Sequence, residues 1–180
     1  MILILATVIV AFAIGLAAGG SLGDFPTLRL RMWWLAIAGI VLQLAPASGD
    51  LALGLLLLSF AALIAFTVVN LRTPGFFLVL VGLALNALVI TANHGMPVTR
   101  QALQDSGQGA TITDLVEHGG AKHQLATTDT ALLPIADVIG VPPPLGQALS
   151  IGDLCLHLGI GWFIVFAMRP RDAGAEPVRS

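Results

Sequence analysis

The chain has 180 residues; 57% of them are hydrophobic, only 10% are charged, and the mean hydropathy is +0.94. Soluble globular domains carry about 45–50% apolar and about 25% charged residues, so this chain has too few charges to cover a water-facing surface. Its net charge of −2 leaves no basic excess for a nucleic-acid partner. The lone Cys155 excludes an internal disulfide and offers no cysteine pair for zinc or redox chemistry.

Five apolar stretches predict membrane-spanning helices, because crossing the hydrocarbon core takes about 17–25 apolar residues. They cover residues 2–19, 30–45, 51–70, 75–92 and 149–168. The second stretch is the shortest, but Arg29 and Arg31 at its start can extend toward the interface. We therefore predict an all-α membrane protein with a single five-transmembrane-helix domain over residues 1–168. The polar end, residues 169–180, is predicted to be a disordered tail.

The positions of lysine and arginine predict the orientation, since positive residues gather in cytoplasmic loops. If the helices alternate, six of these residues fall on one side: Arg29, Arg31, Arg72, Arg169, Arg171 and Arg179. The other side holds Arg100 and Lys122, both in one long connection. An integral plasma-membrane protein with its N-terminus outside and its C-terminus in the cytoplasm is the prediction. The first stretch could instead be a cleaved signal peptide, but no Lys or Arg precedes its apolar run.

Residues 93–148 form the long outer connection, and connections of this length are usually functional or disordered. Short helices are predicted after Thr99 and over residues 113–117. Residues 132–139 are apolar enough either to enter the membrane or to lie on its surface. The prolines at 142–144 predict a stiff, extended lead into the last helix. We expect a small folded extracytoplasmic lid between the fourth and fifth helices.

Polar residues inside apolar spans are costly, so their spacing carries information. In the last span Asp153 and His157 are four residues apart and can lie side by side on a helix. Asp153 either completes a capping box with Ser150 or serves a ligand or a proton. His157 is either a neutral histidine hydrogen-bonded between helices or part of a site. Asn86 and Gln43 are expected to form hydrogen bonds between helices.

Metal binding is not favoured by the histidine pattern. His118 and His123 are separated by four residues and His94 begins the same connection, which matches no familiar zinc pattern. The sequence contains neither a serine nucleophile elbow nor a phosphate-binding glycine loop, so no metal and no cofactor are predicted. Asp137 and Asp153 are candidate catalytic groups only if the fold brings the two carboxylates together.

The motifs of the outer connection resemble one bacterial membrane family. They are Asn93-His94-Gly95-Met96-Pro97-Val98, Lys122-His123, the apolar segment that contains Asp137, and Ser150-Ile151-Gly152-Asp153. The family is catalogued as domain of unknown function 5317, and the resemblance extends over essentially the whole chain up to Met168. It implies a bacterial plasma-membrane location, no known reaction, and a usual glycine where this chain has His94. The outer-face constellation that it suggests comprises Asn93, Gly95, Pro97, Lys122, His123, Asp137 and Asp153.

Three functions agree with these patterns. The first is a non-enzymatic membrane protein that binds a small ligand, a lipid or a protein partner, and its ligand-binding residues would be Asn93, Lys122, His123, Asp137, Asp153 and His157. The second is a membrane-embedded enzyme acting on a lipid or envelope substrate, with Asp137 and Asp153 as acid and base. The third is an oligomeric proton or ion conductor that uses Asn86, Gln43, Asp153 and His157. The oligomeric state stays open, and the predicted partner in each case is the lipid bilayer.

Overall fold

The computed structural model describes residues 2–23, 29–117 and 122–169. Five long apolar helices form a bundle, and their bounds lie within four residues of the predicted stretches. The helices are α1 (Ile2–Ala17), α2 (Trp33–Leu44), α3 (Gly49–Val69), α4 (Phe76–Asn93) and α7 (Ile151–Ala167). The predicted tail, apart from Arg169, lies outside the described residues.

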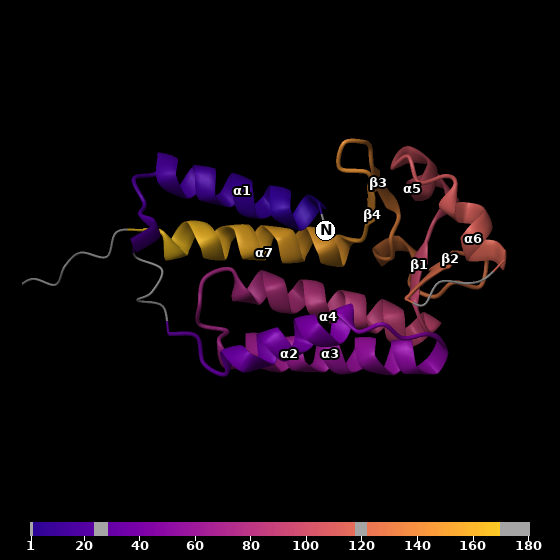
Figure 1. Ribbon diagram of the computed structural model, residues 1–180, viewed down its shortest axis with the longest axis horizontal. Helices are drawn as coiled ribbons and strands as arrows, with labels where there is room; N and C mark the ends of the chain where they lie inside the picture. Colours follow the sequence, from indigo (N-terminus) through magenta and orange to yellow (C-terminus); the bar gives the residue numbers. More distant parts are fainter. Residues whose placement is uncertain (1, 24–28, 118–121, 170–180) are drawn as a thin grey trace, which may run out of the picture.

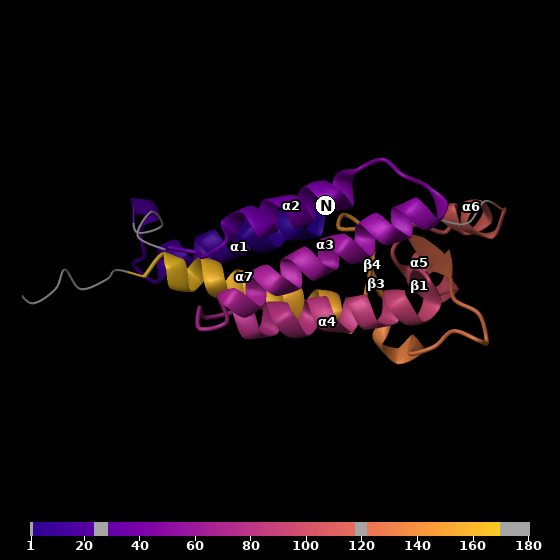
Figure 2. The same cartoon turned by 90° about the horizontal axis from the view of Figure 1, so that it is seen from below.

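The bundle is open on one side. Helix α7 packs between α1 and α4, α4 packs on α3, and α3 packs on α2, so that α1 and α2 are the two outer helices of the series. In the part of the chain that the structure describes, no extensive packing joins α1 to α2. Successive helices run in alternating directions, and the connection between α4 and α7 folds at one end of the bundle (Figures 1 and 2).

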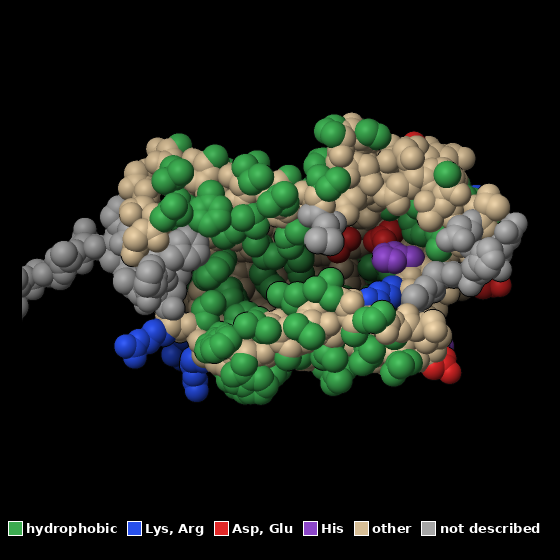
Figure 3. Space-filling model, in the orientation of Figure 1, with side chains coloured by type: hydrophobic (Ala, Val, Ile, Leu, Met, Phe, Trp, Pro, Cys, Tyr) green, Lys and Arg blue, Asp and Glu red, His purple; other side chains and the backbone are tan. Residues whose placement is uncertain are grey.

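Two of the helices, α3 with 21 residues and α4 with 18, are long and apolar enough to cross a membrane. The other three are shorter, and α2 has only 12 residues, which corresponds to about 18 Å of helix. All five expose large apolar side chains: Leu5, Ile37, Leu58, Leu88 and Leu158 are each more than half exposed. Hydrophobic side chains also cover much of the face shown in Figure 3. Exposed apolar surface on every helix is typical of a bundle that faces lipid.

A seam of four glycines lets α4 and α7 approach closely. A Cβ atom at Gly82 would lie 2.8 Å from the backbone nitrogen of Leu156, and one at Gly159 would lie 2.7 Å from the carbonyl oxygen of Gly75. Gly152, opposite Gly82, likewise has the side chain of Asn86 directly above it. Gly152 and Gly159 are seven residues apart on one face of α7, and Gly75, immediately before α4, is seven residues from Gly82. Small residues of this kind let helix backbones come together in membrane bundles.

The connection between α4 and α7 is a folded lid, as predicted, but it is not all helical. Its elements are β1 (Met96–Val98), α5 (Arg100–Asp105), α6 (Thr111–Glu117), β2 (His123–Leu125), the 3₁₀ turn η2 (Leu133–Ile135), β3 (Ile139–Val141) and β4 (Gln147–Leu149). Strands β1 and β2 pair in parallel, and β3 and β4 form an antiparallel hairpin. The two short helices agree with the sequence prediction. The all-α prediction is wrong in the lid, since strands this short carry too few residues to show an alternating pattern.

The prolines at 142–144 lie in the turn of the β3–β4 hairpin, so the predicted extended lead into the last helix is wrong. Cross-strand bonds fold this segment back on itself, and Pro tolerates such a turn because it has no N–H to pair. Residues 132–139 turn inward only in part: Leu132 is exposed, whereas Ile135 and Ala136 pack on the apolar core formed by α3, α4 and Met96.

His94 ends α4 in the left-handed conformation, with φ 57° and ψ 30°. Glycine is the usual residue at this position of a helix end because it has no Cβ to clash. This geometry explains the glycine that the family resemblance implies at position 94.

The glycine seam gives a first prediction. Gly82→Ala should lower the free energy of unfolding in detergent by about 1–3 kcal/mol, because the added methyl group has no room against α7. The matched control is Gly54→Ala in α3, where a Cβ atom meets nothing within 4 Å. That change should leave stability unchanged or raise it by up to about 1 kcal/mol, since alanine favours helix. Thermal unfolding of the two purified variants compares them directly, and equal stabilities would contradict the seam.

Candidate functional site

Strand β1 brings His123 and Asp137 together although 13 residues of chain separate them. On one side, β1 pairs with β2, which places His123 opposite Met96. On the other side, Val98 forms a bridge with Asp137, whose backbone nitrogen donates to the carbonyl of Pro97 at 3.0 Å. The two side chains meet with His123 Nε2 3.8 Å from Asp137 Oδ2. Parallel pairing on both sides of one short strand therefore builds one wall of the site.

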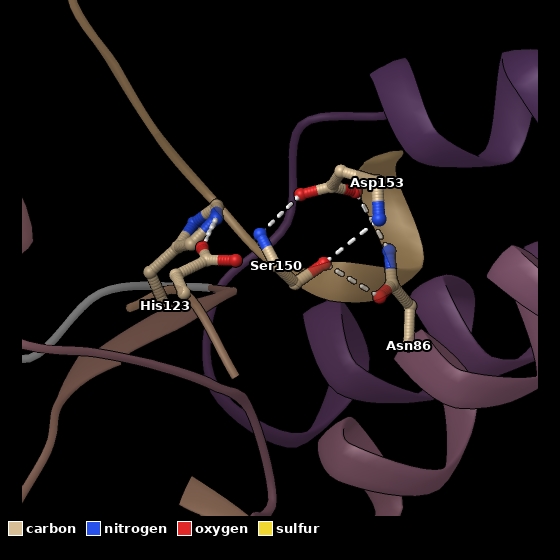
Figure 4. Close-up of polar contacts among 5 residues, drawn as sticks. Asn86, His123, Ser150 and Asp153 are labelled. Atoms are coloured by element: carbon tan, nitrogen blue, oxygen red, sulfur yellow. Dashed lines mark hydrogen bonds and ion pairs between the residues drawn. The ribbon is translucent and has the colours of Figure 1, made fainter. Parts of the chain in front are cut away.

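Asp153 forms the opposite wall, at the start of α7 (Figure 4). Its Oδ2 accepts from the backbone nitrogen of Ser150 at 3.1 Å, and Ser150 Oγ accepts from the backbone nitrogen of Asp153 at 2.9 Å, which completes a capping box. Asn86 of α4 donates through Nδ2 to Asp153 Oδ1 at 2.8 Å and accepts from Ser150 Oγ at 2.9 Å. The predicted capping box and the predicted hydrogen bond from Asn86 to another helix are both present. Asp153 thus joins α4 to α7 while its side chain lines the site.

Lys122 connects the lid to α2. Its Nζ donates to the backbone carbonyl of Gln43, one of the last four carbonyls of α2, which have no partner inside the helix. A cation is also favoured at a helix C-terminus by the helix dipole. At the other outer helix, Gln147 Oε1 accepts from the backbone nitrogen of Leu3 at 3.2 Å. Each outer helix is therefore bonded to the lid by one side chain.

Two neighbouring cavities share Lys122, His123 and Asp137. The inner cavity, about 230 Å³, lies between the lid and the bundle and is also lined by Gln43, Leu56, Phe60, Asn86, Ile90, Met96 and Asp153. The outer cavity, about 450 Å³, lies within the lid and is also lined by Val98, Leu103, Gln108, Thr111, Leu115, Gln147 and Ala148. In Figure 3, Asp, His and Lys side chains gather at the lid end of a hollow lined by hydrophobic side chains. Together these two cavities form the recess.

Asp137 is the most unusual group in the recess. Only 7% of its side chain is exposed, and its Oδ1 is buried without a hydrogen-bond partner. Burial, with a smaller contribution from the charge of Asp153, raises the pKa of Asp137 to about 8. At neutral pH the carboxyl is therefore mostly protonated and can both donate and accept a hydrogen bond. A buried polar atom without a partner costs about 1–3 kcal/mol, which a bound group could recover.

His123 is held mainly in its neutral form. Loss of hydration lowers its pKa, Lys122 lowers it further, and Asp153 opposes the shift. The side chain is nevertheless 59% accessible, and it lines both cavities, so that its accessible surface faces the recess. The pair of His123 and Asp137 is thus a contact between two mostly neutral groups at pH 7.

Two of the predicted ligand-binding residues lie elsewhere. Asn93 bonds to Ala131 through both its amide oxygen, at 2.9 Å, and its amide nitrogen, at 3.0 Å, which fastens the lid to the end of α4. His157 Nδ1 lies 3.0 Å from Thr7 Oγ1 of α1, as expected for a histidine bonded between helices, and lines a separate groove between α1 and α7. The structure therefore brings together Lys122, His123, Asp137 and Asp153, without Asn93 or His157.

Nothing among the described residues favours a metal. No group of three or more His, Cys, Asp or Glu side chains within residues 2–23, 29–117 and 122–169 could hold an ion. His118, one of the histidines considered from the sequence, lies outside the described residues.

No pattern in the sequence indicated the polar residues of the outer cavity, Gln108, Thr111 and Gln147. They are uncharged, follow no periodic pattern, and come together only through the lid fold. The glycine seam could have been found from its spacing, since the seven-residue interval occurs twice.

The fold and the recess define a helical-bundle protein with a polar recess beneath a folded lid. This chain belongs to a family of unknown function (DUF5317), whose model matches residues 27–165, and the resemblance seen in the sequence is confirmed. An uncharacterized protein of Thermotoga maritima is 34% identical over 117 residues, which make up 63% of each chain. The match thus spans less than two thirds of that relative's length. No solved structure matches this chain.

Protonation of Asp137 gives a prediction about pH. Its pKa is about 8 in the fold and about 3.9 in an unfolded chain, so the folded state binds the proton more tightly. The resulting stabilisation is fully present below about pH 4, declines as the pH rises above that value, and is lost once the pH has passed about 8. His123 acts in the opposite direction, but its lowered pKa confines its titration to pH values near or below 6.5. Between pH 7 and 9 the change in the free energy of unfolding therefore reports the ionisation of Asp137.

We expect the unfolding temperature of the wild-type protein in detergent to fall from pH 7 to pH 9. The steepest slope in the free energy of unfolding would be about 1.4 kcal/mol per pH unit. Asp137→Asn should abolish this fall, whereas the exposed Asp129→Asn should keep it. If the unfolding temperature of Asp137→Asn fell in parallel with that of the wild type, the titration of another group would have to cause the fall.

Proposed function

We propose that this chain is a five-span protein of the bacterial plasma membrane that binds a membrane lipid, with the lipid's polar end in the recess beneath the lid. The observation that carries the proposal is Asp137: a carboxyl group, buried and with one oxygen unpartnered, in the wall shared by two cavities. Small-molecule sites are typically concave, largely apolar and equipped with a few polar groups that orient the ligand. The recess is likewise concave, and about half of the side chains that line it are polar.

Charge and exposed apolar surface support the membrane location. Arg29, Arg31, Arg72 and Arg169 are exposed in the connections and at the helix end opposite the lid. Cytoplasmic ends carry such positive residues, so the lid would face outward. The short α2 fits the same arrangement, since a helix of about 18 Å ends at membrane depth. Its terminal carbonyl is satisfied there by Lys122, and irregular backbone at such depth is tolerated where it lines a cavity.

The open side of the bundle supports a lipid ligand rather than a water-soluble one. The hollow between α1 and the α2–α3 pair is lined by hydrophobic side chains and reaches the polar groups at its lid end (Figure 3). The inner cavity combines both kinds of surface, because Phe60 and Ile90 face the same space as Asp137 and Asp153. A lipid would fit these two surfaces, with its acyl chain along the hydrophobic helices and its polar group beneath the lid.

The orientation can be tested with single cysteines. In a Cys155→Ser background, Gln104→Cys in the lid should react with a membrane-impermeant maleimide in intact cells. Leu71→Cys, in the exposed turn between α3 and α4, should react only after the membrane is permeabilised. Labelling of Leu71→Cys in intact cells, with Gln104→Cys protected, would reverse the orientation. Recovery of the protein in the soluble fraction would overturn the membrane location.

Lipid binding can be tested by native mass spectrometry after reconstitution in nanodiscs of a total bacterial lipid extract. The wild-type protein should retain lipid when released into mild detergent, and Asp137→Leu should retain about tenfold less, the equivalent of one lost hydrogen bond of about 1.4 kcal/mol. Asp129→Asn, an exposed lid carboxylate, should behave like the wild type. Equal retention by all three proteins would contradict the proposal.

A further inference from the structure

The charges that surround the recess restrict the kind of polar group it can hold. Among the residues that the structure describes, Lys122 is the one cation that lines the cavities, and its Nζ already donates to the carbonyl of Gln43. It faces two carboxyl groups, Asp137 and Asp153. A phosphate is usually bound by several Arg or Lys side chains or by the free N–H groups of a helix N-terminus. The described residues of the recess offer neither: Lys122 is their one basic side chain, and Ser150 and Asp153 already cap the N-terminus of α7.

A positively charged headgroup fits no better. Quaternary ammonium groups are bound by aromatic faces, chiefly Trp and Tyr, and Phe60 is the one aromatic side chain that lines the two cavities among the described residues. A primary amine would face Lys122 at close range. Asn86 and the backbone of Ser150 already occupy one acceptor site on each oxygen of Asp153, so an amine would have to share this carboxylate with two donors.

The remaining groups suit hydroxyls. A protonated Asp137 carboxyl, a neutral His123 imidazole, two glutamine amides and a threonine hydroxyl can each donate and accept hydrogen bonds without a net charge. Gln108 is held in place by its Nε2, which donates to the carbonyl of Gly146, and Gln147 by the bond from Leu3. The outer cavity, at about 450 Å³, is within the roughly 300–1,000 Å³ typical of small-molecule sites.

From this we infer that the ligand is a lipid with an uncharged, hydroxyl-bearing headgroup, such as a glycosylated diacylglycerol, whose hydroxyls lie in the outer cavity and hydrogen-bond with the carboxyl group of Asp137. This inference rests on the proposed lipid-binding function and specifies its ligand. The lipid glycoside is favoured over a free sugar because the inner cavity, between Asp137 and the bundle, is lined by Leu56, Phe60 and Ile90.

The test uses the full chain in nanodiscs of phosphatidylcholine, each doped with one probe lipid of matched acyl chains. The probes are a diglucosyl diacylglycerol, phosphatidylglycerol and phosphatidylethanolamine, with free glucose as a soluble arm. Native mass spectrometry should show the glycolipid retained at least tenfold over both phospholipids, and glucose alone should not bind. Asp137→Asn should keep this preference, because an amide reproduces the donor and acceptor of a protonated carboxyl. Thr111→Trp, which fills the outer cavity from its exposed rim, should reduce glycolipid retention about tenfold.

The pH dependence separates this inference from the broader proposal. Retention of the glycolipid by the wild type should fall above pH 8, and retention by Asp137→Asn should not. If phosphatidylglycerol or phosphatidylethanolamine is retained as well as the glycolipid, or if glucose alone binds, the headgroup inference is wrong. Dependence on Asp137 would then still support the recess as a binding site. If Asp137→Leu retains every probe as well as the wild type does, the headgroup inference and the proposed function both fail.

Discussion

The close approach of α4 and α7 is the constraint on which the rest of this structure depends. Glycines at 82 and 152 leave no side chain between the two backbones, and Asn86 then reaches Ser150 and Asp153 across the gap. This network fixes where α7 begins, and so where the lid must end. A buried polar network that satisfies its members is more rigid than a set of separate contacts. The inner cavity is consequently held between elements that cannot move independently.

The lid is attached mainly through groups that helix ends leave unpaired. Lys122 donates to a carbonyl near the end of α2, Gln147 accepts from the first turn of α1, and Gln124 donates to the carbonyl of Asn93 at the end of α4. Helix termini have free carbonyls and N–H groups that would otherwise be costly away from water. Using lid side chains as caps lets the bundle keep an open side between α1 and α2 without leaving those ends unsatisfied. Asp137 differs from these residues because its buried Oδ1 forms no hydrogen bond.

Much of the helical bundle could be predicted from the sequence, because apolar runs, charged turns and the Ser150–Asp153 capping box are local features. Within the candidate site, the grouping of Lys122, His123, Asp137 and Asp153 came from a family resemblance, since spacing alone could not show that they converge. The strands of the lid were missed: each has three residues, and their pairing depends on partners more than 20 residues away for β1. The raised pKa and the unpartnered oxygen of Asp137 could not be predicted from the sequence, because both depend on the residues that surround it in the fold.

The central claim is that Asp137 is a protonated carboxyl group that forms a hydrogen bond with a bound lipid. Infrared spectroscopy tests it most directly, because the C=O stretch of a protonated carboxyl is separate from the bands of carboxylates. At pH 7 the wild-type protein should show this band, Asp137→Asn should lack it, and addition of the glycosylated diacylglycerol should move it to lower frequency as the hydrogen bond forms. A wild-type spectrum without the band at pH 7, or a band that the lipid leaves unchanged, would contradict the account.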